Sequence, residues 1–194
     1  MNTLLNNISI PGFFDAKLAF DSLPTILSGL PMSLFLLVVC FALANVLGIL
    51  IMLMRISSHR FLSWPARFYI SFLRGIPMLV ILFITYFGFN MAALPAAILS
   101  FTIAPAAFIA EYYRSAFLGV DEAARSLGLP YHNIILNVIL PQAFRIALPS
   151  LGNVMLDLFK GTSLAAMITV SEIFMEAKVV AGAAQDYMSI YIVV

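Results

Sequence analysis

Charged residues are scarce in this chain. Asp, Glu, Lys and Arg make up 10% of its 194 residues, whereas a typical soluble domain carries about 25%. None of the four occurs in residues 22–54 or 75–110, and hydrophobic residues reach 63% of the whole. A membrane-spanning helix needs about 20 mostly apolar residues. The first gap therefore holds one span and the second about two, which excludes an ordinary soluble domain.

Other residues and motifs that the chain lacks exclude several kinds of binding and catalytic site. The single cysteine, Cys40, lies in an apolar stretch, so a disulfide framework or a thiolate metal cluster is not available. His59 and His132 have no Asp, Cys or second His at ligand spacing, and we expect no metal site. The chain also lacks a G-x-x-x-x-G-K-[ST] segment for nucleotide phosphates and a recognisable catalytic triad. A net charge of +1 gives no indication of nucleic-acid binding. We therefore expect a protein that is not an enzyme and holds no cofactor.

The apolar runs predict an all-α integral membrane protein with about five transmembrane helices. Residues 1–24 are interpreted as a lead-in outside the membrane, and residues 25–194 as the membrane domain. Asp21 or Ser22 is expected to cap the first helix, with Pro24 in its first turn. The predicted apolar spans cover residues 25–54, 70–87, 93–110, 146–174 and 187–194.

Basic residues alternate between successive loops. Three arginines follow the first span and three follow the third, whereas the other segments carry only Lys17 and Lys178. Under the positive-inside rule this places the N-terminus outside and residues 111–145 in the cytoplasm. In the first span, Ala44 and Gly48 form a small-xxx-small pair that would let another helix approach closely, although ordinary small-residue content explains it equally well.

One cytoplasmic stretch has the pattern of a helical hairpin. Residues up to Leu127 are good helix formers, Gly128 supplies a stop, and Pro130 can open a second helix. We therefore expect two short helices over residues 121–140, a shape suited to docking on a partner. Physical reasoning alone supports an interfacial connection between two spans equally well.

This stretch resembles the EAA loop of ABC (ATP-binding-cassette) importer permeases. That loop has Glu-Ala-Ala, three residues, Gly, nine residues, then Ile-x-Leu-Pro. The same spacing occurs here, with Val138 in place of Ile, and the residues that would couple to an ATPase are Glu122, Ala123, Ala124, Gly128, Leu140 and Pro141.

Other segments resemble the polar amino-acid branch of that family. Residues 72–77 are similar to its FLRGTP segment, and residues 110–114 to AEIFR. Residues 140–143 match LPQA, and residues 158–164 are similar to LLKDTSL. The resemblance runs from about residue 25 to the end of the chain in matching order.

The resemblance implies a permease subunit for polar amino acids, located in a bacterial inner or plasma membrane and surrounded by lipid. It implies a coupling segment at about 119–141, between the third and fourth helices, that docks on a separate ATPase. That ATPase partner would bind ATP and Mg²⁺. A second permease subunit, in a homo- or heterodimer, and an extracytoplasmic binding protein are also implied. The alternative is a secondary transporter or channel, but such proteins usually contain repeated halves, which are not found here.

The chain departs from the family pattern in three places. The loop between the second and third spans is shorter than expected. A short Lys-Gly-Gln turn is missing before Glu122, so we predict a gap or an abnormal join between Val120 and Asp121. The last apolar run has eight residues, and at 1.5 Å per residue these cover only about 12 Å of a bilayer.

Charged residues inside the apolar regions are the remaining candidates. Asp157 and Lys160 lie near mid-depth in the fourth region, where ionisable groups usually face a cavity or a partner. We expect a helix break at Lys160–Gly161, with Thr162 and Ser163 capping a new helix. These four residues would then line a substrate pathway, unless Asp157 and Lys160 simply pair with each other.

Two more sets of charges have simpler interpretations. Arg74, near the start of the second span, is typical of an arginine that extends to the membrane interface. Glu111 and Arg114 are three residues apart on one helix face and are predicted to form a local ion pair.

Overall fold

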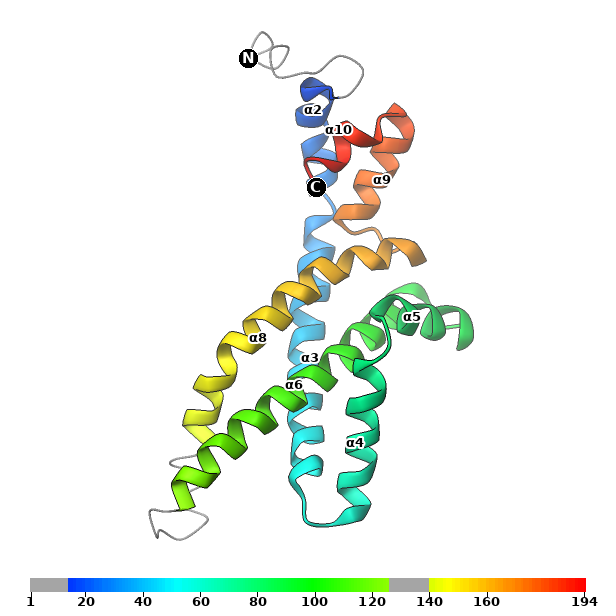
Figure 1. Cartoon of the computed structure of the whole chain (residues 1–194). Helices are drawn as coiled ribbons and strands as arrows, with labels where there is room; N and C mark the ends of the chain where they lie inside the picture. Colours follow the sequence, from blue (N-terminus) through cyan, green and yellow to red (C-terminus); the bar gives the residue numbers. More distant parts are fainter. Residues whose placement is uncertain (1–13, 126–139) are drawn as a thin grey trace.

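The computed structural model of the chain describes residues 14–125 and 140–194, with the backbone alone at 121–125 and 140. It is built from helices, which confirms the predicted all-α class (Figure 1). In chain order the elements are α2 (Ala16–Leu27), α3 (Leu30–Ile56), α4 (Arg60–Arg74), α5 (Met78–Phe83), the π-helical turn η1 (Ile84–Gly88), α6 (Ala93–Arg125), α8 (Leu140–Thr162), the 3-10 helix η3 (Ser163–Ile168), α9 (Ile173–Ala184) and α10 (Tyr187–Tyr191).

Two of these helices are long and apolar enough to cross a bilayer. They are α3 and the part of α6 that covers Ala93–Val120. The pair formed by α4 and the α5–η1 unit passes the same test, but it is bent by 105°. The described residues thus hold two candidate spans, or three if the bent pair counts as one. The expected number of five is not confirmed.

The span predicted over residues 70–87 is not a single helix. Its chain turns sharply between α4 and α5, where Gly75 ends the first helix and Pro77 precedes the second. The physical reason is local, because proline disfavours the helical conformation in the residue before it and lacks a backbone N–H to donate.

The first helix begins earlier than predicted. Its cap is Asp15, whose carboxylate accepts hydrogen bonds from the backbone N–H groups of Lys17 (2.9 Å) and Leu18 (3.1 Å). Neither Asp21 nor Ser22 starts a helix, because α2 runs through both. A separate helix, α3, then begins at Leu30 with a proline in its first turn.

Close packing of α3 on α6 forms the centre of the fold. Ala44 and Gly48 are buried in this contact, and a Cβ atom added at Gly48 would lie 2.7 Å from Cγ2 of Ile109 and 3.2 Å from the carbonyl oxygen of Ala106. The close-approach interpretation of the Ala44 and Gly48 pair is therefore confirmed.

The last apolar run folds back on the first described helix. Ile190 of α10 is fully buried beside Ile26 of α2 and Ala177 of α9, and the Ser189 hydroxyl accepts a hydrogen bond from the backbone N–H of Asp15 (2.8 Å). In this structure α10 therefore packs against α2 and α9 as a short helix.

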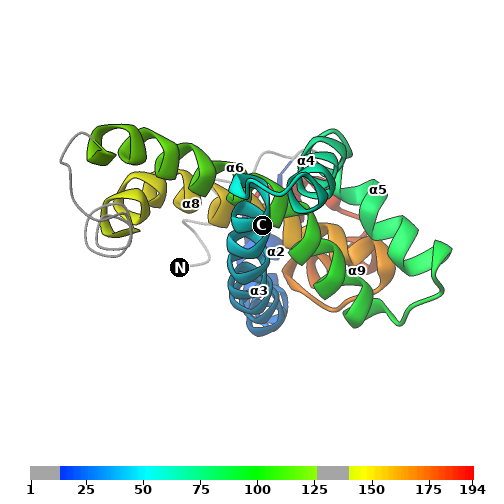
Figure 2. The same ribbon diagram turned by 90° about the horizontal axis from the view of Figure 1, so that it is seen from below.

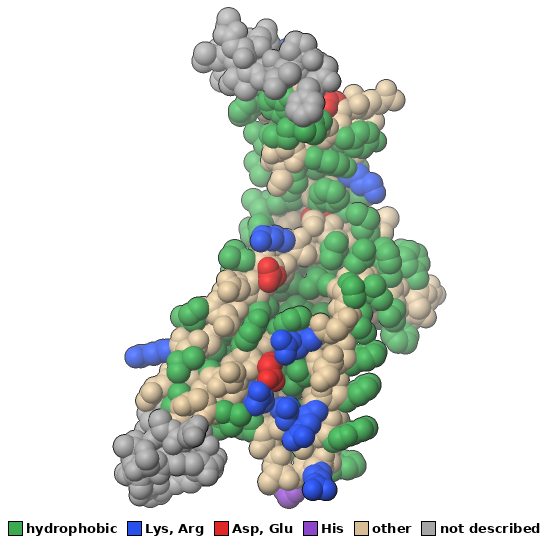
Figure 3. All heavy atoms as spheres, viewed as in Figure 1, with side chains coloured by type: hydrophobic (Ala, Val, Ile, Leu, Met, Phe, Trp, Pro, Cys, Tyr) green, Lys and Arg blue, Asp and Glu red, His purple; other side chains and the backbone are tan. Residues whose placement is uncertain are grey.

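Different helices and turns lie at the two ends of the molecule. In Figure 1, α2 and the C-terminus lie at one end, while the α3–α4 turn and the last turns of α6 lie at the other. Seen from below, the adjoining ends of α6 and α8 lie on one side of α3, with α4 and α5 on the other (Figure 2). Figure 3 shows mostly hydrophobic side chains on the surface, with Lys and Arg gathered over α4 and the adjoining part of α6.

Candidate functional site

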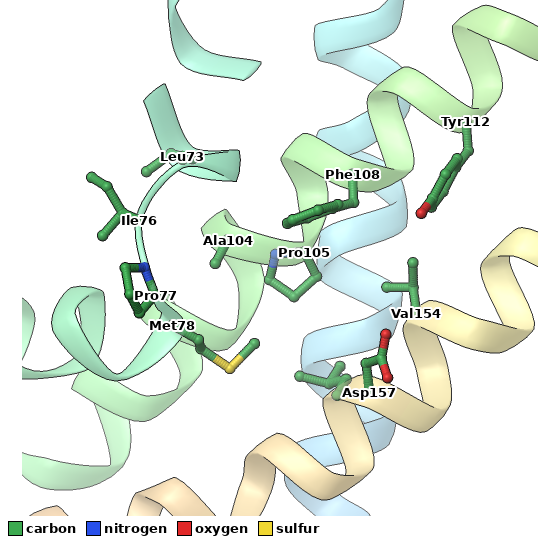
Figure 4. Close-up of a pocket in the computed structure, with 11 residues that line it drawn as sticks. Leu73, Ile76, Pro77, Met78, Ala104, Pro105, Phe108, Tyr112, Val154 and Asp157 are labelled. Atoms are coloured by element: carbon green, nitrogen blue, oxygen red, sulfur yellow. The ribbon is translucent and has the colours of Figure 1, made fainter. Parts of the chain in front are cut away.

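A cavity of about 340 Å³ lies where the α4–α5 turn faces α6 and α8 (Figure 4). Three segments that are distant in sequence supply its walls, which are mainly apolar. The Tyr112 hydroxyl and the Asp157 carboxylate are its polar side-chain groups. The lining residues are Leu73, Ile76, Pro77, Met78, Ala104, Pro105, Phe108, Tyr112, Val154, Asp157 and Leu158.

The sharp turn after α4 forms one wall of this cavity. Two contacts hold the turn against α6: the Tyr69 hydroxyl donates a hydrogen bond to the carbonyl oxygen of Ile103 (2.6 Å), and the Arg74 guanidinium lies 5.2 Å from the centre of the Phe108 ring. A cation over an aromatic face at this distance is attracted by the ring quadrupole. The break that sequence reasoning treated as part of a span thus positions residues around the cavity.

Asp157 is the acidic group of the cavity. Its side chain projects from α8 toward the side of the cavity formed by α6 (Figure 4). Within residues 14–125 and 140–194 it has no hydrogen-bond or ion-pair partner. An unpartnered carboxylate in a largely apolar cavity is suited to a ligand that carries a positive charge.

The alternative pairing of Asp157 with Lys160 is not formed. In the described part of the chain, the recorded ion pair joins Arg114 to Glu111. Lys160 instead lines a second cavity of about 310 Å³, together with Thr162, Ser163 and Glu172. The four predicted pathway residues are therefore divided between two cavities, with Asp157 in the first and the other three in the second.

The predicted helix break at Lys160–Gly161 is wrong. The helix α8 continues to Thr162 and then tightens into η3, which ends at Thr169 in a left-handed conformation (φ 66°). The hydroxyls of Thr162 and Ser163 do not cap a new helix, because each donates back to a carbonyl oxygen three residues earlier at 2.7 Å. Short polar side chains use such local acceptors readily.

The new helix after this region begins at α9, and its cap is Glu172. The Glu172 carboxylate is buried and accepts hydrogen bonds from the backbone N–H groups of Phe174 (3.0 Å) and Met175 (2.8 Å). The Ser33 hydroxyl of α3 lies 3.4 Å from the same carboxylate and accepts a hydrogen bond from the N–H of Ile173 (3.2 Å). Sequence reasoning missed Glu172, because Ser, Thr, Asp and Asn are the usual N-cap residues.

The coupling residues are only partly described. Glu122, Ala123 and Ala124 belong to the last turns of α6, whose backbone runs as one helix through Val120 and Asp121. The interruption expected at that join is not seen. Gly128 lies outside the described residues, as does the rest of the predicted hairpin, so the two-helix prediction remains a prediction.

The structure also describes the C-terminal end of the coupling segment, at residues 140–141, and the predicted ion pair of Glu111 with Arg114. Leu140 begins α8, and Pro141 follows it in the first turn with an exposed side chain. In α6, Arg114 Nε donates to Glu111 Oε2 at 3.0 Å, which confirms the predicted local ion pair.

The chain matches the family model described as "Binding-protein-dependent transport system inner membrane component" over residues 44–194. It is 46% identical over 198 residues to the "Probable amino-acid ABC transporter permease protein YckA" of Bacillus subtilis (strain 168), covering 97% of this chain and 88% of that protein. It is 34% identical over 189 residues to the "Probable glutamine ABC transporter permease protein GlnM" of the same organism, covering 93% of this chain and 88% of that protein.

The fold is also similar to that of a solved structure. The "Crystal structure of an amino acid ABC transporter with histidines" contains a chain with a TM-score of 0.81 and 30% sequence identity, covering 90% of this chain and 86% of that one. Sequence and fold thus lead to the same group of proteins.

Proposed function

The chain belongs to the family of binding-protein-dependent transport system inner membrane components, and from this premise we propose that it is the permease subunit of an ATP-driven importer for polar amino acids. It is an integral protein of the bacterial cell membrane. Within this chain, the main structural support for the proposal is the cavity between the α4–α5 turn, α6 and α8, with Asp157 in its wall.

A permease of this family works with an ATP-hydrolysing subunit and a substrate-binding protein. In the proposed assembly, Glu122, Ala123, Ala124 and Gly128 dock on the ATPase, and Leu140 and Pro141 close the docking segment. ATP and Mg²⁺ bind to that partner, while this chain performs no chemistry and supplies the pathway. A second permease subunit completes the membrane part.

The proposed orientation places the N-terminus outside the cell. The α3–α4 turn, which is flanked by Arg55 and Arg60, lies at the same end of the molecule as the last turns of α6 (Figure 1). Basic residues favour the cytoplasmic side. Because α2 and the C-terminus lie at the opposite end, both face the extracytoplasmic binding protein in this orientation.

The proposed pathway uses the charge of Asp157. A free amino acid carries an ammonium group, and the exposed carboxylate of Asp157, which has no partner among the described residues, offers it an opposite charge. The cavity volume of about 340 Å³ falls at the small end of the range of ligand sites, which suits a single amino acid. Lys160, Thr162 and Ser163 line the neighbouring cavity and form another part of the pathway.

The test uses the complete importer in liposomes, with this permease, its ATPase and its binding protein. We expect uptake of labelled amino acid that requires ATP, and ATP hydrolysis that rises when the loaded binding protein is added. Asp157→Asn should reduce the uptake rate by about tenfold or more, since it removes about 1.4 kcal/mol or more of interaction. Asp21→Asn, which alters an exposed carboxylate on α2, is the matched control and should transport normally.

Two outcomes would contradict the proposal. Uptake driven by an ion gradient without ATP would indicate a secondary transporter. A double exchange, Asp157→Lys with Lys160→Asp, tests the pathway role: if transport survives it with unchanged substrate preference, the two charges are structural and Asp157 does not line the pathway.

A further inference from the structure

One face of α4 carries exposed aromatic rings next to exposed arginines. Phe61, Trp64 and Phe68 are 90%, 71% and 60% exposed, and the rings of Trp64 and Phe68 are stacked with their centres 6.4 Å apart. Arg60 and Arg67 are also exposed. Trp64 is three or four residues from each of the other four, and residues at this spacing are neighbours on a helix surface. We call these five residues the outer face of α4. The opposite face packs on α3 and α6 and buries Ser63, Ala66, Ile70 and Leu73.

The two arginines of the outer face have no counter-charge in the described part of the chain. Arg60 and Arg67 make no hydrogen bond and no ion pair there. The sequence has nine acidic residues, none of them in residues 22–110, and none in the undescribed ranges 1–13 and 126–139. Five of the nine cap or belong to α2, α9 and α10, at the opposite end of the molecule from the α3–α4 turn (Figure 1): Asp15, Asp21, Glu172, Glu176 and Asp186.

The other four acidic residues are also directed elsewhere. Glu111 accepts hydrogen bonds from the guanidinium of Arg114, and Asp157 of α8 lines the cavity described above. Asp121 and Glu122 belong to the last turns of α6, which lie on the opposite side of α3 from α4 (Figure 2). The positive charge of the outer face is therefore available to a group outside this chain.

The depth of the outer face in the membrane indicates what that group is. The helix α4 begins three residues after the end of α3, a candidate span, and runs beside it (Figure 1). Arg60 therefore lies near the membrane surface, and Phe68 lies about 12 Å further along the helix axis. Tryptophan is typical of this interface, and a long arginine side chain can extend back to it. The outer face thus spans the depth at which a phospholipid has its phosphate and the upper part of its acyl chains.

We propose that the outer face of α4 binds an anionic phospholipid, whose phosphate contacts Arg60 and Arg67 and whose acyl chains pack on Trp64 and Phe68. Guanidinium groups suit phosphate because they combine a positive charge with several N–H donors. A zwitterionic lipid brings a positive charge of its own and is attracted less strongly. An apolar helix of a second subunit would cover the rings but leave two buried guanidinium groups without counter-charge, which is costly. The inference requires only that the chain lies in a membrane, so it stands or falls separately from the transport function.

The test uses Trp64 as the probe, because it is the single tryptophan of the chain. The full-length permease is reconstituted in phosphatidylcholine vesicles. Trp64 fluorescence is measured as phosphatidylglycerol or phosphatidylcholine with brominated acyl chains replaces the unbrominated lipid, since bromine quenches a tryptophan that it contacts. We expect phosphatidylglycerol to bind at Trp64 about fivefold or more tightly than phosphatidylcholine, because each arginine near the lipid surface contributes a factor of about five. Salt at about 1 M shortens the Debye length to roughly 3 Å and should reduce this preference.

Variants locate the effect in the outer face. Arg60→Gln combined with Arg67→Gln should abolish the preference for phosphatidylglycerol but leave quenching by both lipids, because the acyl chains still reach Trp64. Arg145→Gln combined with Lys178→Gln removes two exposed positive charges from α8 and α9 and should keep the preference. If the double variant of the outer face does not insert in vesicles, the single variants replace it, and each should lower the preference by about twofold or more.

Four results would overturn the inference. The first is equal binding of the two lipids by the unaltered chain, and the second is an unchanged preference in the inserted variants of Arg60 and Arg67. The third is the absence of quenching by either lipid, which would show that protein, such as a second copy of this chain, covers Trp64. The fourth is loss of the preference in excess inorganic phosphate but not in chloride of the same ionic strength, which would indicate a site for the free ion.

Discussion

Replacing Gly48 with alanine tests the packing that holds α3 against α6. The added Cβ atom would lie 2.7 Å from Cγ2 and 3.0 Å from Cβ of Ile109, and 3.2 Å from the carbonyl oxygen of Ala106. Ile109 is fully buried and β-branched, so its side chain has no free rotamer to adopt. The oxygen belongs to the helix backbone, so the two helices must move apart.

The expected cost can be separated from helix propensity. Overpacking of a well-packed contact costs about 1–3 kcal/mol, while replacing glycine by alanine within a helix gains about 1 kcal/mol. Gly152, in α8, provides a matched control because a Cβ added there meets no atom within 4 Å. The propensity gain is common to both variants, so the difference in unfolding free energy between Gly48→Ala and Gly152→Ala should equal the overpacking cost, about 1–3 kcal/mol.

The assay is unfolding of the purified permease in mixed detergent micelles, with increasing sodium dodecyl sulfate and helicity followed by circular dichroism. Gly48→Ala should unfold at a lower dodecyl sulfate fraction than Gly152→Ala. If the two variants unfold together, or if Gly48→Ala is the more stable, then α3 and α6 are not in close contact at this point and the reasoning is refuted.

Two further changes test contacts near the cavities. Glu172→Ala should lower the unfolding free energy by about 1–2 kcal/mol through loss of the α9 cap, while Glu172→Gln should be milder because its amide oxygen can still accept from the N–H groups of Phe174 and Met175; equal effects in the same unfolding assay would contradict the capping role. Tyr69→Phe should cost about 1 kcal/mol by removing the hydrogen bond to the Ile103 carbonyl oxygen, and Tyr187→Phe, in α10, is a control that should have no effect on the α4–α6 contact.

Properties that belong to one segment could be predicted from the sequence. The charge-free stretches 22–54 and 75–110 indicated an apolar, helical membrane protein, because a bilayer excludes charge wherever a helix is exposed to it. The pair Glu111 and Arg114 followed from helical spacing. The close approach at Gly48 was one of two interpretations that the sequence left open, and the packing of α3 on α6 decided it. The residues that begin each helix were harder to predict from the sequence. Asp15 and Glu172 are the caps observed, whereas Asp21, Ser22, Thr162 and Ser163 looked suitable in the sequence and lie inside continuous helical segments.

Only the tertiary structure could decide which residues share a cavity. Residues 73–78, 104–112 and 154–158 form one site because a 105° bend after α4 directs its turn toward α6 and α8. Helical spacing allowed Asp157 and Lys160 to meet, yet different neighbours surround each of them, and they face separate cavities. Hydropathy and spacing describe a helix by itself, whereas the burial, partners and orientation of each side chain depend on the helices that pack around it.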